Sequence, residues 1–224
     1  AYNYDRSLDS HMMKNTEWGA VAYLSHSKYG INSEIRINNS SAYTTGCAAT
    51  TPALNYVKKE QSNHTEGYYN GCENAYNTPV GVLASTTGNI SGIYDMSGGS
   101  IEIMAAYREN TYGNSGFDES SISKYDSKYF DIYPVNSTTI SYNNRILGDA
   151  TGELGPFYAY KDNDNYNRNH STWYNDYAQF IESSSPWVIR GGYYYIGTLS
   201  GIFNFNRSSG VSNGENSFRL VLTN

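Results

Sequence analysis

The segment at residues 190–222 constrains the fold most, because its glycines and phenylalanines recur at fixed places among side chains that share no character. It reads RGGYYYIGTLSGIFNFNRSSGVSNGENSFRLVL. Glycine permits backbone turns that other residues adopt at a cost. The two ends of the segment resemble strands of a core. We expect Phe203 and Phe205 to anchor the segment in that core, while the side chains between the recurring glycines and phenylalanines face outward.

The three consecutive tyrosines of this segment make the expectation specific. Side chains two residues apart on an extended strand point to the same face. Tyr193 and Tyr195 are therefore expected to share the outer face, and Tyr194 is expected to be buried on the other.

The composition of the whole chain is typical of a binding surface. It holds 24 Tyr and 21 Gly, and only 16% of its residues are charged. Binding loops favour Tyr with small polar residues, because Tyr gives a large contact area for little rotamer entropy. The alternative interpretation is a loop-rich secreted bacterial protein.

Length and charge limit the classes of protein that fit. A chain of 224 residues is expected to form a single domain, residues 1–224. Its net charge of −6 and scattered basic residues argue against nucleic acid as a partner. No apolar run reaches the roughly 20 residues that span a bilayer. Any export signal or membrane anchor is expected upstream of Ala1.

The chain has two cysteines, Cys47 and Cys72, each preceded by Gly in a polar segment. An even count in a tyrosine-rich chain favours an oxidising compartment and one disulfide, with two free thiols as the alternative. Closing this loop of about 25 residues would stabilise the fold by about 3.5 kcal/mol in the chain-entropy model.

Periodicity and turn residues predict an α+β chain rich in loops. A helix is expected in residues 15–30, with Asn15 or Thr16 as N-cap, Gly30 as its end and Trp18, Val21, Ala22 and Leu24 at helical spacing. Short helical pieces are expected at ALNYVKKEQ and in residues 172–181. Strands are expected at residues 101–107, FDIYPV, WVIRGG and SFRLVL.

Metal and catalytic signals are weak. The four histidines lie in polar surroundings without a paired motif and are expected at the surface: His11, His26, His64 and His170. Residues 161–169, KDNDNYNRN, place oxygen ligands at alternate positions as a calcium loop does, but they lack its Gly and distal Glu. We expect no cofactor and a solvated polar loop, with bound calcium as the less favoured alternative. WYND at residues 173–176 has the wrong spacing for the Trp-Asn-Asp calcium motif.

Several motifs, in order along the chain, carry a family resemblance. GNISGIYDMSGGSIE, PWVIRGG, SFRLVL and the earlier NTEWGAVAYL together resemble the formylglycine-generating-enzyme type of C-type lectin fold. The sequence departs from that pattern at Gly99 and Ile101, where the family often has Asn and Trp. The catalytic members that it resembles use late cysteines, and no Cys follows Cys72, so we expect no such enzyme activity.

A second resemblance explains the segment at residues 187–222. It is similar to the C-terminal variable region of proteins diversified by retroelements, in which adenine-directed mutations alter Asn codons. The frame of that group is matched by Arg190, Gly191, Gly192, Gly197, Gly201, Phe203, Phe205, Gly210, Ser217, Phe218 and Arg219. The variable positions are Tyr193, Tyr195, Ile196, Leu199, Arg207, Ser208, Ser209, Val211 and Gly214. All nine residues are reachable from AAC by changing adenines alone, and Glu215 is not.

The resemblance implies a function. It implies a non-catalytic protein that is displayed on a bacterial cell surface or a phage particle and binds a protein or surface glycan through the variable positions. The alternatives are an enzyme-like family member with an unknown activity, and a structural pilus or phage tail subunit.

Overall fold

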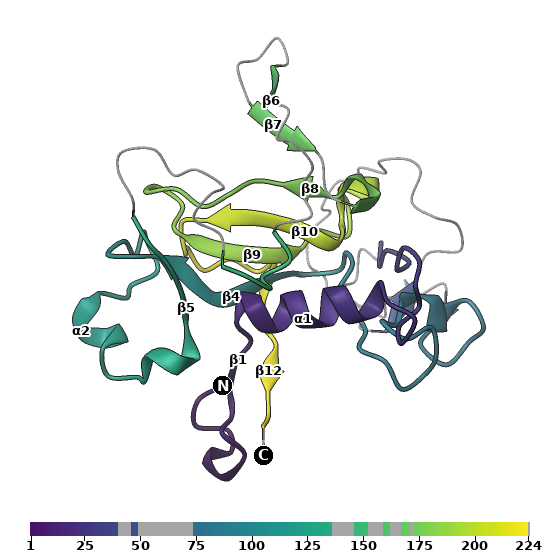
Figure 1. The fold of residues 1–224 in the computed structure, drawn as a ribbon, viewed down its shortest axis with the longest axis horizontal. Coiled ribbons are helices and arrows are strands. Elements are labelled where there is room, and N and C mark those ends of the chain that lie inside the picture. Colours follow the sequence, from purple (N-terminus) through teal and green to yellow (C-terminus); the bar gives the residue numbers. More distant parts are fainter. Residues whose placement is uncertain are drawn as a thin grey trace.

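The computed structural model describes residues 1–39, 46–48, 74–135, 146–151, 159–161, 167–170 and 173–223. These residues form a mixed α+β architecture in which one long helix crosses a face of the main sheet (Figure 1). The α+β class predicted from the sequence is confirmed.

The main sheet has eight strands in the order β11-β4-β9-β10-β8-β7-β6, with β5 paired to β4. Its strands are β4 (Ile101–Arg108), β5 (Asp131–Tyr133), β6 (Ala159–Lys161), β7 (Asn167–His170), β8 (Tyr177–Ala178), β9 (Trp187–Gly191), β10 (Gly201–Ser208) and β11 (Asn216–Ser217). β4, β9 and β10 form an antiparallel centre, while β5, β8 and β11 join it in parallel. The predicted strands at residues 101–107, FDIYPV and WVIRGG are confirmed.

Helix α1 (Asn15–Ser25) packs its Trp18 and Ala22 against the sheet, where both are fully buried. The predicted helix is confirmed, but its caps are not Asn15, Thr16 or Gly30. Lys14 is the N-cap, and its backbone N–H donates to the Glu17 carboxylate at 2.8 Å.

The first turn of α1 is also capped from a distant strand. The Thr16 N–H donates to Asp131 of β5 at 2.6 Å, and the Asn15 side chain donates to the buried Tyr133 hydroxyl at 2.6 Å. Leu24, expected on the buried face, is 57% exposed, because the buried face of α1 runs through Trp18, Ala22 and Ser25, and Leu24 lies off that face.

The two ends of the described chain meet in a separate two-stranded sheet. β1 (His11–Met12) pairs with β12 (Leu220–Val221), and both ends leave the molecule side by side (Figure 1). The predicted SFRLVL strand is therefore confirmed only in part, because it splits between β11 and β12. Phe218 lies between them and is 57% exposed.

The remaining elements are short. They are β2 (Cys47–Ala48), β3 (Asn74–Ala75), α2 (Glu119–Ile122) and the 3₁₀ helices η1 (Arg6–Leu8), η2 (Gly81–Ala84), η3 (Ser127–Tyr129), η5 (Trp173–Asn175) and η6 (Gly197–Leu199). The expected helix within ALNYVKKEQ lies outside the described residues.

The helix predicted for residues 172–181 is wrong. Only the single turn η5 forms there, and Tyr174 within it has a φ of 70°. The chain then enters β8, which pairs with β10. Asp176 is buried and accepts the Phe203 N–H at 2.9 Å. This tertiary pairing overrides the local helical pattern.

Candidate ligand-binding surface

The frame of the C-terminal segment is built around Arg190, whose side chain is fully buried. Its guanidinium lies 5.7 Å from the ring centres of both Trp18 and Phe205, and one of its nitrogens donates to the Ile202 carbonyl at 3.4 Å. Arg190 therefore joins α1 to β10 in the core and is not a ligand-binding residue.

The glycine pair after Arg190 is required by backbone geometry. Gly191 and Gly192 both have positive φ, at 84° and 77°. A Cβ on Gly192 would lie 2.6 Å from the Ser200 hydroxyl and 2.8 Å from its Cα. A side chain at this position would collide with the returning strand, so the turn needs glycine.

Polar side chains of β10 and its approach hold the loop that follows. The Ser200 hydroxyl donates to the Tyr193 carbonyl at 2.6 Å, and the buried Asn204 side chain donates to the Leu199 carbonyl at 2.7 Å. Tyr194 N–H donates to the Gly99 carbonyl at 2.9 Å. The loop backbone is thus fixed at both ends. Sequence reasoning missed Ser200 and Asn204 because neither belongs to the glycine and phenylalanine frame.

The tyrosines of the loop lie as the alternation predicts. Tyr194 is only 8% exposed, whereas Tyr193 and Tyr195 are partly exposed. The rings of Tyr193 and Tyr195 stack with centres 5.1 Å apart and planes 22° from parallel. They therefore present one joint aromatic surface to the solvent.

The expected burial is confirmed for Phe203 and Phe205 but not for the whole frame, because Phe218 is 57% exposed. Phe203 and Phe205 are at most 2% exposed, and none of the nine variable positions is buried. Val211 is 48% exposed, and Gly214 has open space where a Cβ would stand.

The nine positions do not gather in one place. β10 pairs Gly201 with Gly191 at one end and Ser208 with Trp187 at the other. On β9 the two pairs are four residues apart, because the register shifts between Gly201 and Phe205, so at about 3.3 Å per residue these ends are roughly 13 Å apart. After Ser208 the chain returns, and Asn216 of β11 pairs with Ile101 of β4, near the end of β10 that begins at Gly201.

The variable positions consequently form two groups. The loop group, near the start of β10, comprises Tyr193, Tyr195, Ile196, Leu199 and Gly214. The strand-end group comprises Arg207, Ser208 and Ser209. Val211 lies between the two groups, because its carbonyl accepts a hydrogen bond from the side chain of Asn216 in β11 at 3.2 Å. Within the strand-end group, Arg207 is already paired with the Glu182 carboxylate at 2.6 Å. Spacing in the sequence did not reveal this division, because it depends on how β10 pairs with β9.

A hollow of about 320 Å³ adjoins the loop group. It is lined by Asn38, Asp95, Gly99, Ser100, Glu102, Ser217, Phe218, Arg219 and Leu220. Arg219 Nε donates to Glu102 Oε2 at 3.0 Å, and Arg219 Nη2 donates to the other oxygen of Glu102 and to the Tyr94 carbonyl. Burial raises the pKa of the Glu102 carboxyl, and the Arg219 charge opposes that rise.

Asp95 is the second carboxylate of the hollow. It has a φ of 62° and accepts hydrogen bonds from the Gly46 N–H at 3.0 Å and from the Asn38 amide at 3.2 Å. Burial raises its pKa, while these hydrogen bonds and the Arg219 charge act in the opposite direction. Asp95 and Arg219 stand in the motifs DMSGG and SFRL, so the sequence contained both groups but gave no sign that they meet.

The expectation that all histidines are surface residues is wrong for His11. His11 is 6% exposed, and its Nε2 lies 2.8 Å from Glu17 Oε1, because β1 passes beside the first turn of α1. His26 is partly buried, with its Nδ1 2.5 Å from the Tyr174 hydroxyl and its ring against Trp173. His64 lies outside the described residues, as does the side chain of His170.

Other predicted features fall outside the description. Cys72, the side chain of Cys47 and most of residues 161–169 are not among the described residues. Among the residues that are described, no group of three or more His, Cys, Asp or Glu side chains is placed to hold a metal ion. Within the same ranges, no helix has the length and apolarity needed to cross a membrane.

No family model matches the chain, and no curated protein does. The geometry of the described residues is therefore the basis for the function proposed below.

Proposed function

We propose that the chain is a non-catalytic ligand-binding protein, displayed on a bacterial cell surface or a phage particle, whose C-terminal binding residues are diversified by a retroelement. The proposal includes the C-type lectin-like fold of the formylglycine-generating-enzyme type. The ligand is a protein or a surface glycan.

The observation that carries this proposal is that one segment combines three buried frame side chains with nine accessible side chains of unrelated types. Arg190, Phe203 and Phe205 are at most 2% exposed, whereas all nine variable positions remain accessible. A surface that tolerates substitution without loss of fold is what diversification of binding requires.

The loop group is the favoured contact region. Its backbone is held by Ser200 and Asn204, so little conformational entropy is lost when a ligand binds. Its stacked tyrosines supply the rigid, amphipathic area that dominates many interfaces. Display in many copies raises the avidity of a weak single contact.

The test is a screen against surface proteins and glycans with four versions of the chain. They are the native protein, a variant with Asn at all nine variable positions, and variants with Asn only in the loop group or only in the strand-end group. We expect the nine-position and loop-group variants to lose the target and the strand-end variant to keep it, while thermal stability stays close to native for all. Equal binding by the native and nine-position proteins would place recognition elsewhere, with residues 161–169 as the next candidate.

A gene-level comparison tests the diversification separately. A near-copy of the 3′ end of the gene should lie close by and differ from it only where the copy has adenine. Differences spread over all four bases would refute diversification by a retroelement.

A further inference from the structure

The cations beside the variable surface are already paired within the chain, whereas one carboxylate is not. Arg219 forms a two-point contact with Glu102, and Arg207 pairs with Glu182. Glu215 lies two residues before Ser217 of the hollow, and within the described ranges no basic side chain pairs with it.

The stacked tyrosines lie close to this carboxylate. The Tyr194 N–H donates to the Gly99 carbonyl, and Asn216, the residue after Glu215, pairs with Ile101 two residues further along that segment. Burial raises the pKa of Tyr193, and the negative charge of Glu215 raises it further. The face of a tyrosine ring attracts cations, and a carboxylate beside it strengthens that attraction.

The hollow adds negative charge on the same side. Two carboxylates, Asp95 and Glu102, face one guanidinium, Arg219, which leaves an excess of one negative charge when all three are ionised. Gly99 joins the hollow to the tyrosine loop through its hydrogen bond from Tyr194. Phe218 at the edge is 57% exposed and offers an apolar contact.

We propose that this end of the surface binds an arginine or lysine side chain of a protein partner. The inference rests on the proposed function, because Tyr193 and Tyr195 belong to its loop group. The cationic group contacts the tyrosine rings and Glu215, and its aliphatic stem packs beside Phe218. A neutral glycan offers no charge to these carboxylates, and an anionic glycan is repelled by them, so a basic protein segment is the favoured partner.

The probe is the peptide acetyl-Gly-Arg-Gly-Arg-Gly-amide, titrated into the labelled protein and followed by backbone amide chemical shifts. The matched peptide replaces each Arg by citrulline, which keeps the shape and removes the charge. We expect the Arg peptide to shift the amides of Tyr193, Tyr195, Glu215 and Gly99, and to bind at least fivefold more tightly than the citrulline peptide. Raising the salt concentration should weaken binding of the Arg peptide but not of the citrulline peptide.

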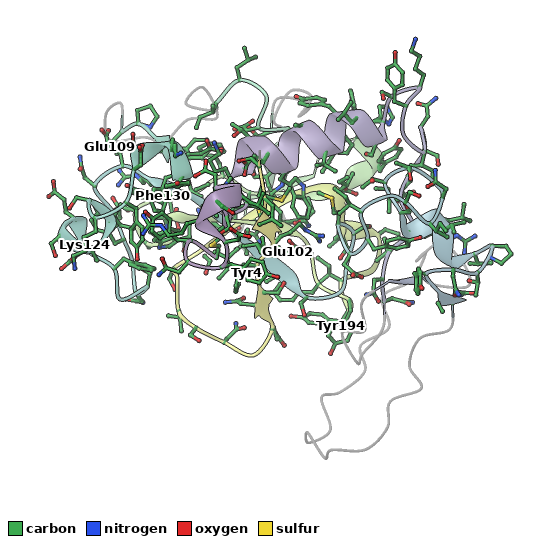
Figure 2. The ribbon with its side chains drawn as sticks, turned by 90° about the horizontal axis from the view of Figure 1, so that it is seen from below. Tyr4, Glu102, Glu109, Lys124, Phe130 and Tyr194 are labelled. Atoms are coloured by element: carbon green, nitrogen blue, oxygen red, sulfur yellow. The ribbon has the colours of Figure 1, made fainter. Side chains whose placement is uncertain are left out.

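Two variants locate the contact. Glu215→Gln should weaken binding of the Arg peptide roughly two- to fivefold, as expected for a partly exposed ion pair. Glu119→Gln removes the same charge from exposed α2 and should leave binding unchanged. Figure 2 shows Tyr194 well apart from Lys124, which follows α2.

Three outcomes would overturn the inference: equal affinity for the two peptides, equal weakening by the two variants, or no binding of the Arg peptide. The last outcome leaves the proposed function intact if the nine-position variant still loses the target in the screen. If the Arg peptide does not bind and the nine-position variant also keeps the target, both the inference and the proposed function are rejected.

Discussion

Gly192 and Gly214 allow a matched test of the division between frame and variable positions. Alanine at Gly192 must adopt a φ of 77°, which costs an L residue about 1 to 2 kcal/mol. Its Cβ would also stand 2.8 Å from the Ser200 Cα, and overpacking of this kind costs about 1 to 3 kcal/mol. We therefore expect Gly192→Ala to reduce the free energy of unfolding by about 2 to 5 kcal/mol.

Alanine at Gly214 meets nothing within 4 Å, and the φ there is not in the left-handed range. Because alanine also restricts the unfolded chain, Gly214→Ala should change stability by less than about 1 kcal/mol. The measurement is chemical denaturation of both variants followed by circular dichroism, with the slope against denaturant compared to the native protein. A Gly192→Ala variant within about 0.5 kcal/mol of native, or a Gly214→Ala variant as unstable as Gly192→Ala, would refute the reasoning.

Three further results are expected. Phe203→Ala should cost about 3 to 5 kcal/mol in the same denaturation assay because the ring is fully buried, whereas the partly exposed Leu199→Ala should stay within about 0.5 kcal/mol; similar losses would contradict the assigned faces. Burial raises the pKa of Asp176 well above 3.8, so the folded state holds this proton more tightly than the unfolded state, and stability should fall as pH rises from about 4 through the raised pKa. Asp176→Asn, which keeps an acceptor for the Phe203 N–H, should lose less stability than the native protein between pH 4 and pH 7, and an unchanged loss would count against this assignment. Mass measurement after thiol alkylation without reductant should find no label on Cys47 or Cys72, and two labelled thiols would remove the main support for an extracellular location.

Local signals in the sequence were sufficient for the elements with strong patterns. The apolar run of β4, the Trp187–Gly191 strand and the helix beginning near Asn15 were each predicted where they occur. In these stretches the propensity of the residues and their final environment agree. The alternation of Tyr193, Tyr194 and Tyr195 was likewise readable, because side chains on extended backbone alternate between faces.

Features were not predictable where a contact with a distant residue overrides the local pattern. The stretch after Trp173 has a helical pattern, but pairing with β10 makes it a turn and a strand. The N-terminus of α1 is capped by Asp131, which lies 115 residues away. Such contacts depend on which strands become neighbours, and no local pattern records that choice.

The sequence by itself determined part of the frame of the C-terminal segment, although it missed the buried Ser200 and Asn204. Glycine tolerates positive φ and close approach, and large aromatic groups gain most from burial, so Gly192, Phe203 and Phe205 show their roles through residue type alone. Only the tertiary structure decided where the variable side chains meet. The antiparallel pairing of β10 with β9 separates Tyr193 from Arg207, and the parallel pairing of β11 with β4 returns the chain to the first end. Strand pairing therefore sets the geometry of the candidate binding surface, because it fixes distances between residues that sequence spacing leaves open.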